Sequence, residues 1–295
     1  MKRIWFQVGM TAMALLGGIE CLAQLPAKGP RRINSRRPLA DAANVLRHLY
    51  GKIITYEEPV LVWDGDLEPL NAKMDPTQKW AVAAKRQAFT TPQDTGTEPN
   101  LALMLDETLK AFHQQTPGTR FKILSSAWGY HIVPVQVHDL NGQLAAASSP
   151  LDTPVYVPVA ERAPSQHLAA LITAIGQGRG PLTELSLANV QSFDRLFRSS
   201  PDRFQWGVTG VVVRDAMIDL LQRSATSFYW NANCFSSFKA EDRGCVVNME
   251  VLQVTVTDPQ GKPANRFLQF DRCGNCPAPV PPPPSRAQPL KEPDR

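Results

Sequence analysis

The sequence predicts an α+β protein made of two tandem βαβ–βαββ-type modules, each with two helices packed on a small mixed sheet. Three observations lead to this fold class. Four amphipathic runs carry apolar residues at helical spacing. Short runs rich in β-branched and aromatic residues follow them. The order helix–strand, then helix–strand–strand, occurs once in each half, which indicates an internal repeat.

Composition limits what the chain can be. Its 295 residues, 43% hydrophobic and 20% charged, suffice for two domains with separate cores. The formal net charge of +4 is spread along the chain, without the basic stripe and interleaved aromatics that nucleic-acid binding needs, so no nucleic-acid partner is expected. The basic run at 28–37 predicts a solvated linker, placed at residues 24–35; a membrane-surface or acidic-partner role is the alternative.

The first residues have the pattern of an export signal. Two basic residues precede an apolar stretch at residues 4–19, and small residues follow at Cys21 and Ala23, the spacing that a signal peptidase recognises. Residues 1–23 are therefore predicted to be a signal peptide. The apolar stretch is short for a membrane span, so no transmembrane segment is expected after cleavage. The mature protein is predicted to be periplasmic or secreted.

The first module is predicted at residues 36–148 and begins with a helix at 38–50. Pro38 suits the first turn, and Gly51 is placed to end the helix with a positive φ. The next run, "KIITY", predicts a strand that "EEP" ends. The apolar stripe of the helix consists of Leu39, Ala42, Ala43, Leu46, Leu49 and Tyr50.

The rest of the first module follows the same logic. Leu105, Leu109 and Phe112 recur at helical spacing and predict a second helix, closed by "PG". Two strands are expected in "RFKILSSA" and "YHIVPVQVHD". Pro134 within the second of these predicts either an edge strand or a bulge, since proline cannot donate to a strand ladder.

The second module is predicted at residues 149–276. Helices are expected in "SQHLAALITAIGQ" and "VVRDAMIDLLQRS", and strands in "TPVYVPV" and "LTELSLANV". "SFYWNANC" and "CVVNMEVLQVTV" predict a hairpin, and a further hairpin turns at 258–261. The tail at 277–295 is Pro-rich with too few apolar residues to form a core, which predicts a disordered segment.

This layout resembles the short N-terminal (STN-like) domain of secretins and TonB-dependent receptors. The resemblance rests on "PLADAANVLRHLYGKIITYEEP" followed by "LDETLKAFHQQTPGTRFKILSSAWGYHIV", and on "VVRDAMIDLLQRSATSFYWN" in the second half. It covers residues 36–138 and, more weakly, 150–257. The resemblance implies an exported bacterial protein that makes protein–protein contacts in the periplasm rather than catalysing a reaction.

The cysteines predict disulfides. Four remain after removal of the leader, Cys234, Cys245, Cys273 and Cys276, and an even number in an oxidising compartment allows three pairings. Cys234 with Cys245 is favoured because the two would flank the open end of a hairpin, and Cys273 with Cys276 would form a small ring. The alternative is an exported thiol–disulfide redox or zinc-binding protein that uses Cys273 and Cys276, although the prolines after Cys276 forbid the helix that activates such a thiol.

No catalytic residue, metal site or cofactor is predicted. His138–Asp139 and the acidic run "WDGDLEP" are interpreted as a strand end and a surface turn. Aromatic residues gather near the second-half hairpin, and interface centres favour such residues. Phe228, Trp230, Phe235 and Phe238 are therefore predicted to form a partner-binding surface. The expected function is that of a non-enzymatic envelope protein which binds another protein or a cell-wall component.

Overall fold

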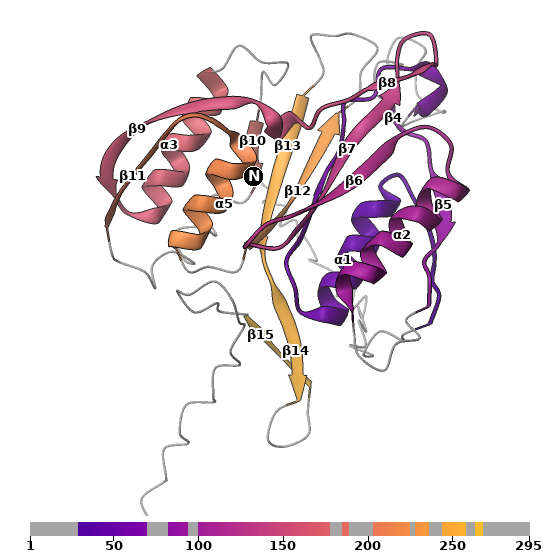
Figure 1. The fold of residues 1–295 in the computed structure, drawn as a ribbon, viewed down its shortest axis with the longest axis horizontal. Coiled ribbons are helices and arrows are strands. Elements are labelled where there is room, and N and C mark those ends of the chain that lie inside the picture. The colour runs from indigo at the N-terminus through magenta and orange to yellow at the C-terminus, as the bar shows by residue number, and fades with distance from the viewer. Residues whose placement is uncertain are drawn as a thin grey trace, which may run out of the picture.

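The computed structural model describes residues 29–69, 82–93, 100–177, 185–188, 203–224, 228–235, 244–257 and 263–267. Over these residues the chain is a mixed α+β protein with four α-helices and several sheets, which confirms the predicted class (Figure 1). The predicted signal peptide (1–23) and Pro-rich tail (277–295) lie outside the described residues. Within the described segments, no helix combines the length and apolarity needed to cross a membrane.

All four helices lie where the apolar spacing predicts them. Helix α1 ends at Gly51, whose φ of 58° is in the left-handed region that favours glycine, as expected. Helix α2 is capped by Asn100, whose side chain accepts a hydrogen bond from the Leu103 N–H. The helices are α1 (Pro38–Tyr50), α2 (Leu101–Gln115), α3 (Pro164–Gln177) and α5 (Val213–Arg223).

Seven strands form the central sheet, in the order β10-β13-β12-β2-β7-β6 with β8 paired to β7. Strands β12, β2 and β7 are parallel, so their carboxyl ends lie at the same end of the sheet. All four residues of β2 are buried, as in a strand covered on both faces. The strands are β2 (Ile54–Glu57), β6 (Arg120–Ser125), β7 (Tyr130–His138), β8 (Leu144–Ala146), β10 (Leu185–Ala188), β12 (Phe228–Phe235) and β13 (Gly244–Val251).

Four two-stranded sheets surround the central one, and one of them corrects the predicted linker. Residues 32–35 form a strand, β1, so the linker predicted at 24–35 is wrong there. Ile33 lies opposite Phe89 and packs with it in the first-half core, which explains why this basic run is ordered. The pairs are β1 (Arg32–Ser35) with β5 (Gln87–Thr90), β3 (Leu67–Pro69) with β4 (Val82–Ala84), β9 (Pro154–Arg162) with β11 (Phe204–Val212) and β14 (Gln253–Thr257) with β15 (Pro263–Phe267).

The two halves share one order of elements, apart from the added pairs β3–β4 and β14–β15 and the added strand β8. The first runs β1–α1–β2, then β5–α2–β6–β7; the second runs β9–α3–β10, then β11–α5–β12–β13. In each, the strand after the first helix is parallel to the last strand, which is antiparallel to the strand before it. Equivalent strands of the two halves run in opposite directions. The last strand of the second half, β13, is antiparallel to β12, whereas β12 is parallel to β2 and so to β7, the last long strand of the first half.

The prediction that each half packs on a sheet of its own is wrong. Strands β2 and β12 pair with each other, with Asn231 opposite Tyr56 and Ala232 opposite Glu57, and this pairing merges the strands of both halves into one sheet. We call this junction the seam. Without it, β2 and β12 would both be edge strands with unpaired backbone groups, which is a liability in a folded protein.

The two pairs of helices cover opposite faces of the central sheet, as Figure 1 shows. Side chains alternate between the two faces along β2. Ile53, just before the strand, packs in the core formed with α3 and α5, whereas Ile54 and Tyr56 pack in the core formed with α1 and α2. The first-half strand β2 is therefore covered by helices of both halves.

Pro134 lies at a bulge and not at a sheet edge. Strand β7 pairs with β2 on one side and with β6 on the other, so the edge-strand alternative is wrong. The register slips between Arg120, which lies opposite Gln136, and Phe121, which lies opposite Pro134. The irregular pairing accommodates the missing N–H of the proline, which confirms the bulge alternative.

Candidate functional site

A cavity of about 500 Å³ opens at the end of the sheet where the parallel strands have their carboxyl ends. In sheets with parallel strands, ligands commonly bind outside the carboxyl ends of those strands. We call this cavity the seam pocket, because Pro59 and Val60, which line it, follow shortly after strand β2 of the seam. Its lining residues are Pro59, Val60, Val137, Ala147, Ser148, Ser149, Pro150, Asp152, Thr153 and Pro154.

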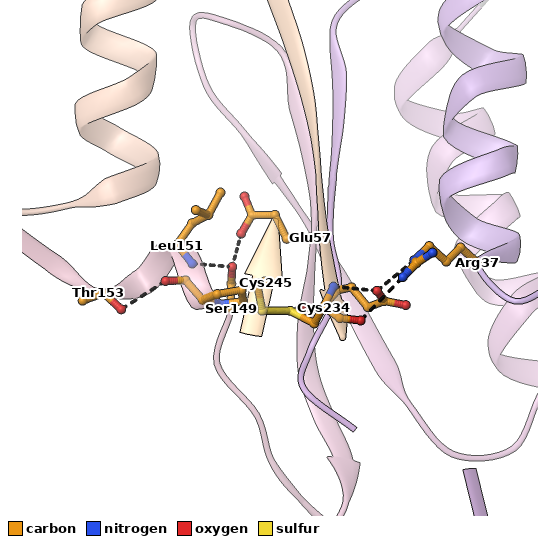
Figure 2. The surroundings of a disulfide bond; sticks show 9 residues. Arg37, Glu57, Ser149, Leu151, Thr153, Cys234 and Cys245 are labelled. Carbon is orange, nitrogen blue, oxygen red and sulfur yellow. Dashed lines mark hydrogen bonds and ion pairs between the residues drawn. A yellow bond between two sulfur atoms is a disulfide. The ribbon is translucent and has the colours of Figure 1, made fainter. Parts of the chain in front are cut away.

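One wall of the seam pocket is the link between the two halves, residues 147–154. A short 3₁₀ turn, η3 (Pro150–Asp152), holds this link in place. The Ser149 hydroxyl accepts the Leu151 N–H at 3.0 Å, while Asp152 accepts the Ser149 N–H at 2.8 Å. Leu151, whose hydrogen bond to Ser149 is drawn in Figure 2, is fully buried in the core with α3 and α5. The wall is therefore anchored to the second half.

A buried ion pair lies beside this wall. Arg214, at the start of α5, donates from Nε to Oε1 of Glu57 at 2.7 Å and from Nη2 to Oε2 at 2.6 Å. The Ser149 hydroxyl also donates to Glu57, and Asp152 lies 2.8 Å from Arg214. Both oxygens of the buried carboxylate are thus occupied, which makes it a structural group and not a free general base.

Electrostatics keeps Arg214 charged. Burial lowers its pKa, but the hydrogen bonds and charge of Glu57, together with Asp152, outweigh this effect and raise the pKa above its ordinary value. The bidentate geometry is the strongest form of an arginine–carboxylate contact. The pair therefore connects strand β2 of the first half to helix α5 of the second half.

His131 lies on the same face of the sheet and is 1% exposed. Its ring nitrogens lie 2.9 Å from the Thr55 hydroxyl and 2.7 Å from the Ser126 hydroxyl, and its ring stacks on Trp230 at 5.5 Å. Burial, with a contribution from the charge of Arg214, lowers the pKa of His131 to about 4. The imidazole is neutral near pH 7, and its surroundings occupy both nitrogens.

The opposite face of the seam has a reciprocal contact through Arg47 of α1. Its Nε donates to the Ile54 carbonyl at 2.5 Å, and Nη2 donates to Asn231 Oδ1 at 2.7 Å. The guanidinium also lies 3.9 Å from the centre of the Tyr229 ring. Burial lowers the pKa of Arg47 to about 10. A first-half helix thus contacts a second-half strand, just as α5 contacts β2.

A disulfide between Cys234 and Cys245 closes the seam region, as the sequence predicts (Figure 2). The two cysteines face each other across β12 and β13, at the connected end of the hairpin and not at its open end. Glu58 accepts the Cys234 N–H at 2.8 Å and the Arg37 Nε–H at 2.9 Å. Burial raises the pKa of Glu58, although Arg37 acts in the opposite direction.

The predicted aromatic surface is wrong for two of its members. Phe228 and Trp230 are fully buried, because β12 is an interior strand with helices on both faces. The Trp230 indole N–H lies 3.4 Å from Glu57 Oε1 and so belongs to the buried seam. The side chain of Phe235, and the whole of Phe238, fall outside the described residues.

The alternative redox or zinc site also falls outside the described residues, because Cys273 and Cys276 do. Among the residues that the structure does describe, no group of three His, Cys, Asp or Glu side chains is placed to hold a metal ion. His138 binds Asp66 at 2.8 Å at the end of β7, in keeping with its interpretation as a strand end.

The charged residues of the seam were not found from the sequence. Glu57 belongs to the run "EEP", which predicts only the end of a strand, and Arg47 lies outside the apolar stripe of its helix. The usable signal is a charged residue directly after an apolar run, as at Arg214 after "GVVV". Comparison of the chain with protein-family models, with curated proteins and with solved structures finds no match.

Proposed function

We propose that the chain is an exported, non-enzymatic envelope protein that binds an apolar group of another protein or of a cell-wall component in the seam pocket. The observation that carries this proposal is the pocket itself. It is lined mainly by proline, valine and alanine side chains, and its one carboxylate, Asp152, already contacts Arg214. Pockets that bind ligands are largely apolar with few polar groups, and most are already formed in the free protein.

The fold supports this proposal through its repeated order of elements. We propose that both halves are STN-like modules that share one sheet, with the second inverted against the first. Domain junctions are common positions for binding sites. The seam pocket lies at the junction of the two modules, and residues 147–154, which connect them, line most of it.

Export is supported by the sequence pattern at residues 1–23 and by the disulfide between Cys234 and Cys245. Disulfides persist in oxidising compartments such as the periplasm and are rare in the cytosol. The periplasmic or secreted location is therefore part of the proposal. It places the seam pocket where envelope proteins and cell-wall polymers are accessible.

The test is to fill the pocket from its exposed rim. Ser148→Trp places an indole at the mouth, and Gln114→Trp introduces the same side chain on the exposed surface of α2 as a control. Partner capture is measured by a photo-crosslinking residue at position 147 in intact cells and by co-sedimentation with isolated cell-wall polymer. Ser148→Trp is expected to weaken capture at least about tenfold, because it occupies the binding volume.

Gln114→Trp is expected to leave capture unchanged. The proposal fails if Ser148→Trp binds as well as the wild type in both assays. It also fails if the wild type gives neither a crosslink that saturates nor sedimentation above the level of the unfolded chain.

A further inference from the structure

Two basic segments of the chain come together in the sheet formed by β1 and β5. Residues 29–37 and 82–93 are far apart in the sequence, and the antiparallel pairing of β1 with β5 places them side by side. Only the first of them stands out as a basic run. We call residues 31–36 and 85–90 the basic ribbon. The two segments contain no acidic residue and six basic ones, Arg31, Arg32, Arg36, Arg37, Lys85 and Arg86.

The hydrophobic core fixes the inner face of the basic ribbon. Ile33 and Phe89 lie opposite each other and pack in the first-half core. Side chains alternate between the two faces of a strand, so Arg32 and Asn34 lie on the outer face, together with Thr90, which is opposite Arg32. All three are exposed. The outer face is therefore held in place and open to a partner.

Carboxylates neutralise two of the arginines and leave other cations uncompensated. Glu68 pairs with Arg36 at 2.8 Å, and Glu58 pairs with Arg37 at 2.9 Å. Three further basic side chains are exposed, and among the described residues no acidic side chain forms an ion pair with them. These three are Arg32, Lys85 and Arg86. The basic ribbon therefore carries an excess of positive charge.

Lys85 lies at the border of the ribbon, next to an acidic residue of the 3₁₀ turn η1 (Asp64–Asp66). Its backbone N–H donates to the Asp66 carbonyl at 2.8 Å. The Asp66 side chain is only 13% exposed and binds His138 at 2.8 Å. This carboxylate is thus turned inward, whereas the Lys85 ammonium is on the surface.

The composition of the outer face indicates the kind of partner. Between the cations lie Asn34, Ala88 and Thr90, with no aromatic or large aliphatic side chain. Centres of protein interfaces favour aromatic anchors, so an acidic protein lacks a docking centre here. Neither Arg32 nor Arg86 lines the seam pocket. A membrane surface with anionic lipids requires only charge from a peripheral protein, which this face supplies.

The chain upstream of the ribbon leads to a membrane during export. The predicted signal peptide has its apolar stretch at residues 4–19, and Arg32 follows about a dozen residues later. A fully extended chain of this length spans at most about 45 Å. The basic ribbon is therefore delivered beside the bilayer that the apolar stretch enters.

We propose that the basic ribbon binds the anionic phospholipid surface of a membrane. Arg32, Lys85 and Arg86 contact the lipid phosphates, while Ile33 and Phe89 hold the ribbon against the core. The attraction is electrostatic and therefore weakens as salt is added. The ribbon shares no residue with the seam pocket, so this attachment goes beyond the function proposed for that pocket and does not depend on it.

The test is co-sedimentation of the full chain with lipid vesicles. One set contains phosphatidylglycerol and phosphatidylcholine in equal parts, and the neutral match is phosphatidylcholine alone. The readout is the ratio of the two affinities, because the apolar stretch at 4–19 binds both vesicles alike. The wild type is expected to prefer the anionic vesicles about hundredfold at about 0.1 M salt, since each basic residue near such a surface contributes about fivefold. Most of this preference is expected to disappear at about 1 M salt.

A triple variant, Arg32→Gln with Lys85→Gln and Arg86→Gln, is expected to lose the preference for anionic vesicles. All three side chains are exposed, so the variant is expected to fold as the wild type does, which urea unfolding checks. A second variant, Arg32→Lys with Arg86→Lys, keeps the charge and is expected to keep the preference. This pair of variants separates the effect of charge from that of side-chain shape.

The matched control removes three exposed cations from other parts of the surface and so lowers the net charge by the same amount. It carries Lys122→Gln on β6, Arg203→Gln before β11 and Arg223→Gln on α5. The control is expected to keep most of the preference. An equal loss in the control and in the ribbon variant would show that net charge alone drives binding, which overturns the proposal.

Two other results would also overturn the proposal. One is equal binding of the wild type to both kinds of vesicle. The other is saturable binding of a soluble polyglutamate peptide without any preference for the anionic vesicles, which would assign the ribbon to an acidic protein. Ser148→Trp does not alter the ribbon and is expected to keep the lipid preference. Failure of the ribbon and failure of the seam pocket are therefore distinguishable.

Discussion

Arg214 and Glu57 form a buried, bidentate ion pair that joins a helix of one half of the chain to a strand of the other. The two residues are 157 positions apart in the sequence. Their contact lies beside the only pairing between β2 and β12, which covers two register positions. The ion pair is therefore one of the contacts that join the halves, and its removal is a direct test of the seam.

Arg214→Met is expected to lower the free energy of unfolding by about 3–5 kcal/mol, because it leaves the Glu57 carboxylate buried without a cation. Urea unfolding at pH 7 measures the change. The control is Arg223→Met on the same helix, whose pair with Asp219 is about half exposed and is expected to contribute less than about 0.5 kcal/mol. Equal losses in the two variants would show that the buried pair does not hold the seam.

Replacing both Cys234 and Cys245 with alanine is expected to reduce the free energy of unfolding by about 3 kcal/mol. The disulfide closes a loop with a sequence separation of 11, and cross-linking such a loop restricts the unfolded chain by about that amount. Denaturant unfolding with and without reductant checks this. Reductant should lower the free energy of unfolding of the wild type to that of the variant and leave the variant unchanged. The prediction is contradicted if the wild type without reductant is no more stable than the variant.

Stability is expected to fall as the pH drops from about 6.5 to 4, partly because of His131. Its pKa falls from 6.5 to about 4 on folding. The unfolded state therefore binds more protons in this window, so a contribution that is complete above pH 6.5 is lost below it, up to about 3 kcal/mol. Unfolding curves of the wild type and of His131→Gln, recorded at both ends of the window, isolate this term. The prediction does not hold if the two proteins lose the same amount.

Phe228→Ala is expected to cost about 3–5 kcal/mol of stability, because Phe228 is fully buried in the core with α3 and α5. Thermal and urea unfolding measure this. Tyr156→Ala, at a residue that is 63% exposed on β9, is the control and should change stability by less than about 0.5 kcal/mol. If Phe228→Ala were as stable as the control, the burial of Phe228 would be contradicted and the surface role that the sequence predicts would be favoured.

The helices were predictable because each carries a local signal. In α2, Leu105, Leu109 and Phe112 are all buried, as their spacing requires. The missing N–H of Pro134 likewise predicted a bulge or an edge strand, although it did not decide between the two. Both inferences use residues a few positions apart, and the physics that decides them acts within one element.

The seam was not predictable for the opposite reason. The choice between two separate sheets and one merged sheet depends on which edges meet, and periodicity along a strand does not determine that. The same limit explains the errors at Phe228 and Trp230, whose burial depends on β12 being an interior strand. The burial of Glu57 and Arg47 has no local signal, because their partners lie in the other half of the sequence.

The helices on opposite faces of the sheet make the two halves resemble the subunits of an obligate dimer that share one polypeptide. Neither half by itself would shield both sides of its own strands, so fragments cut at residue 148 should not be stable alone. Because the segment at 147–154 connects the two halves, they pair within one molecule, whereas separate halves would have to associate between molecules. Assembly of this sheet is therefore first order and independent of protein concentration.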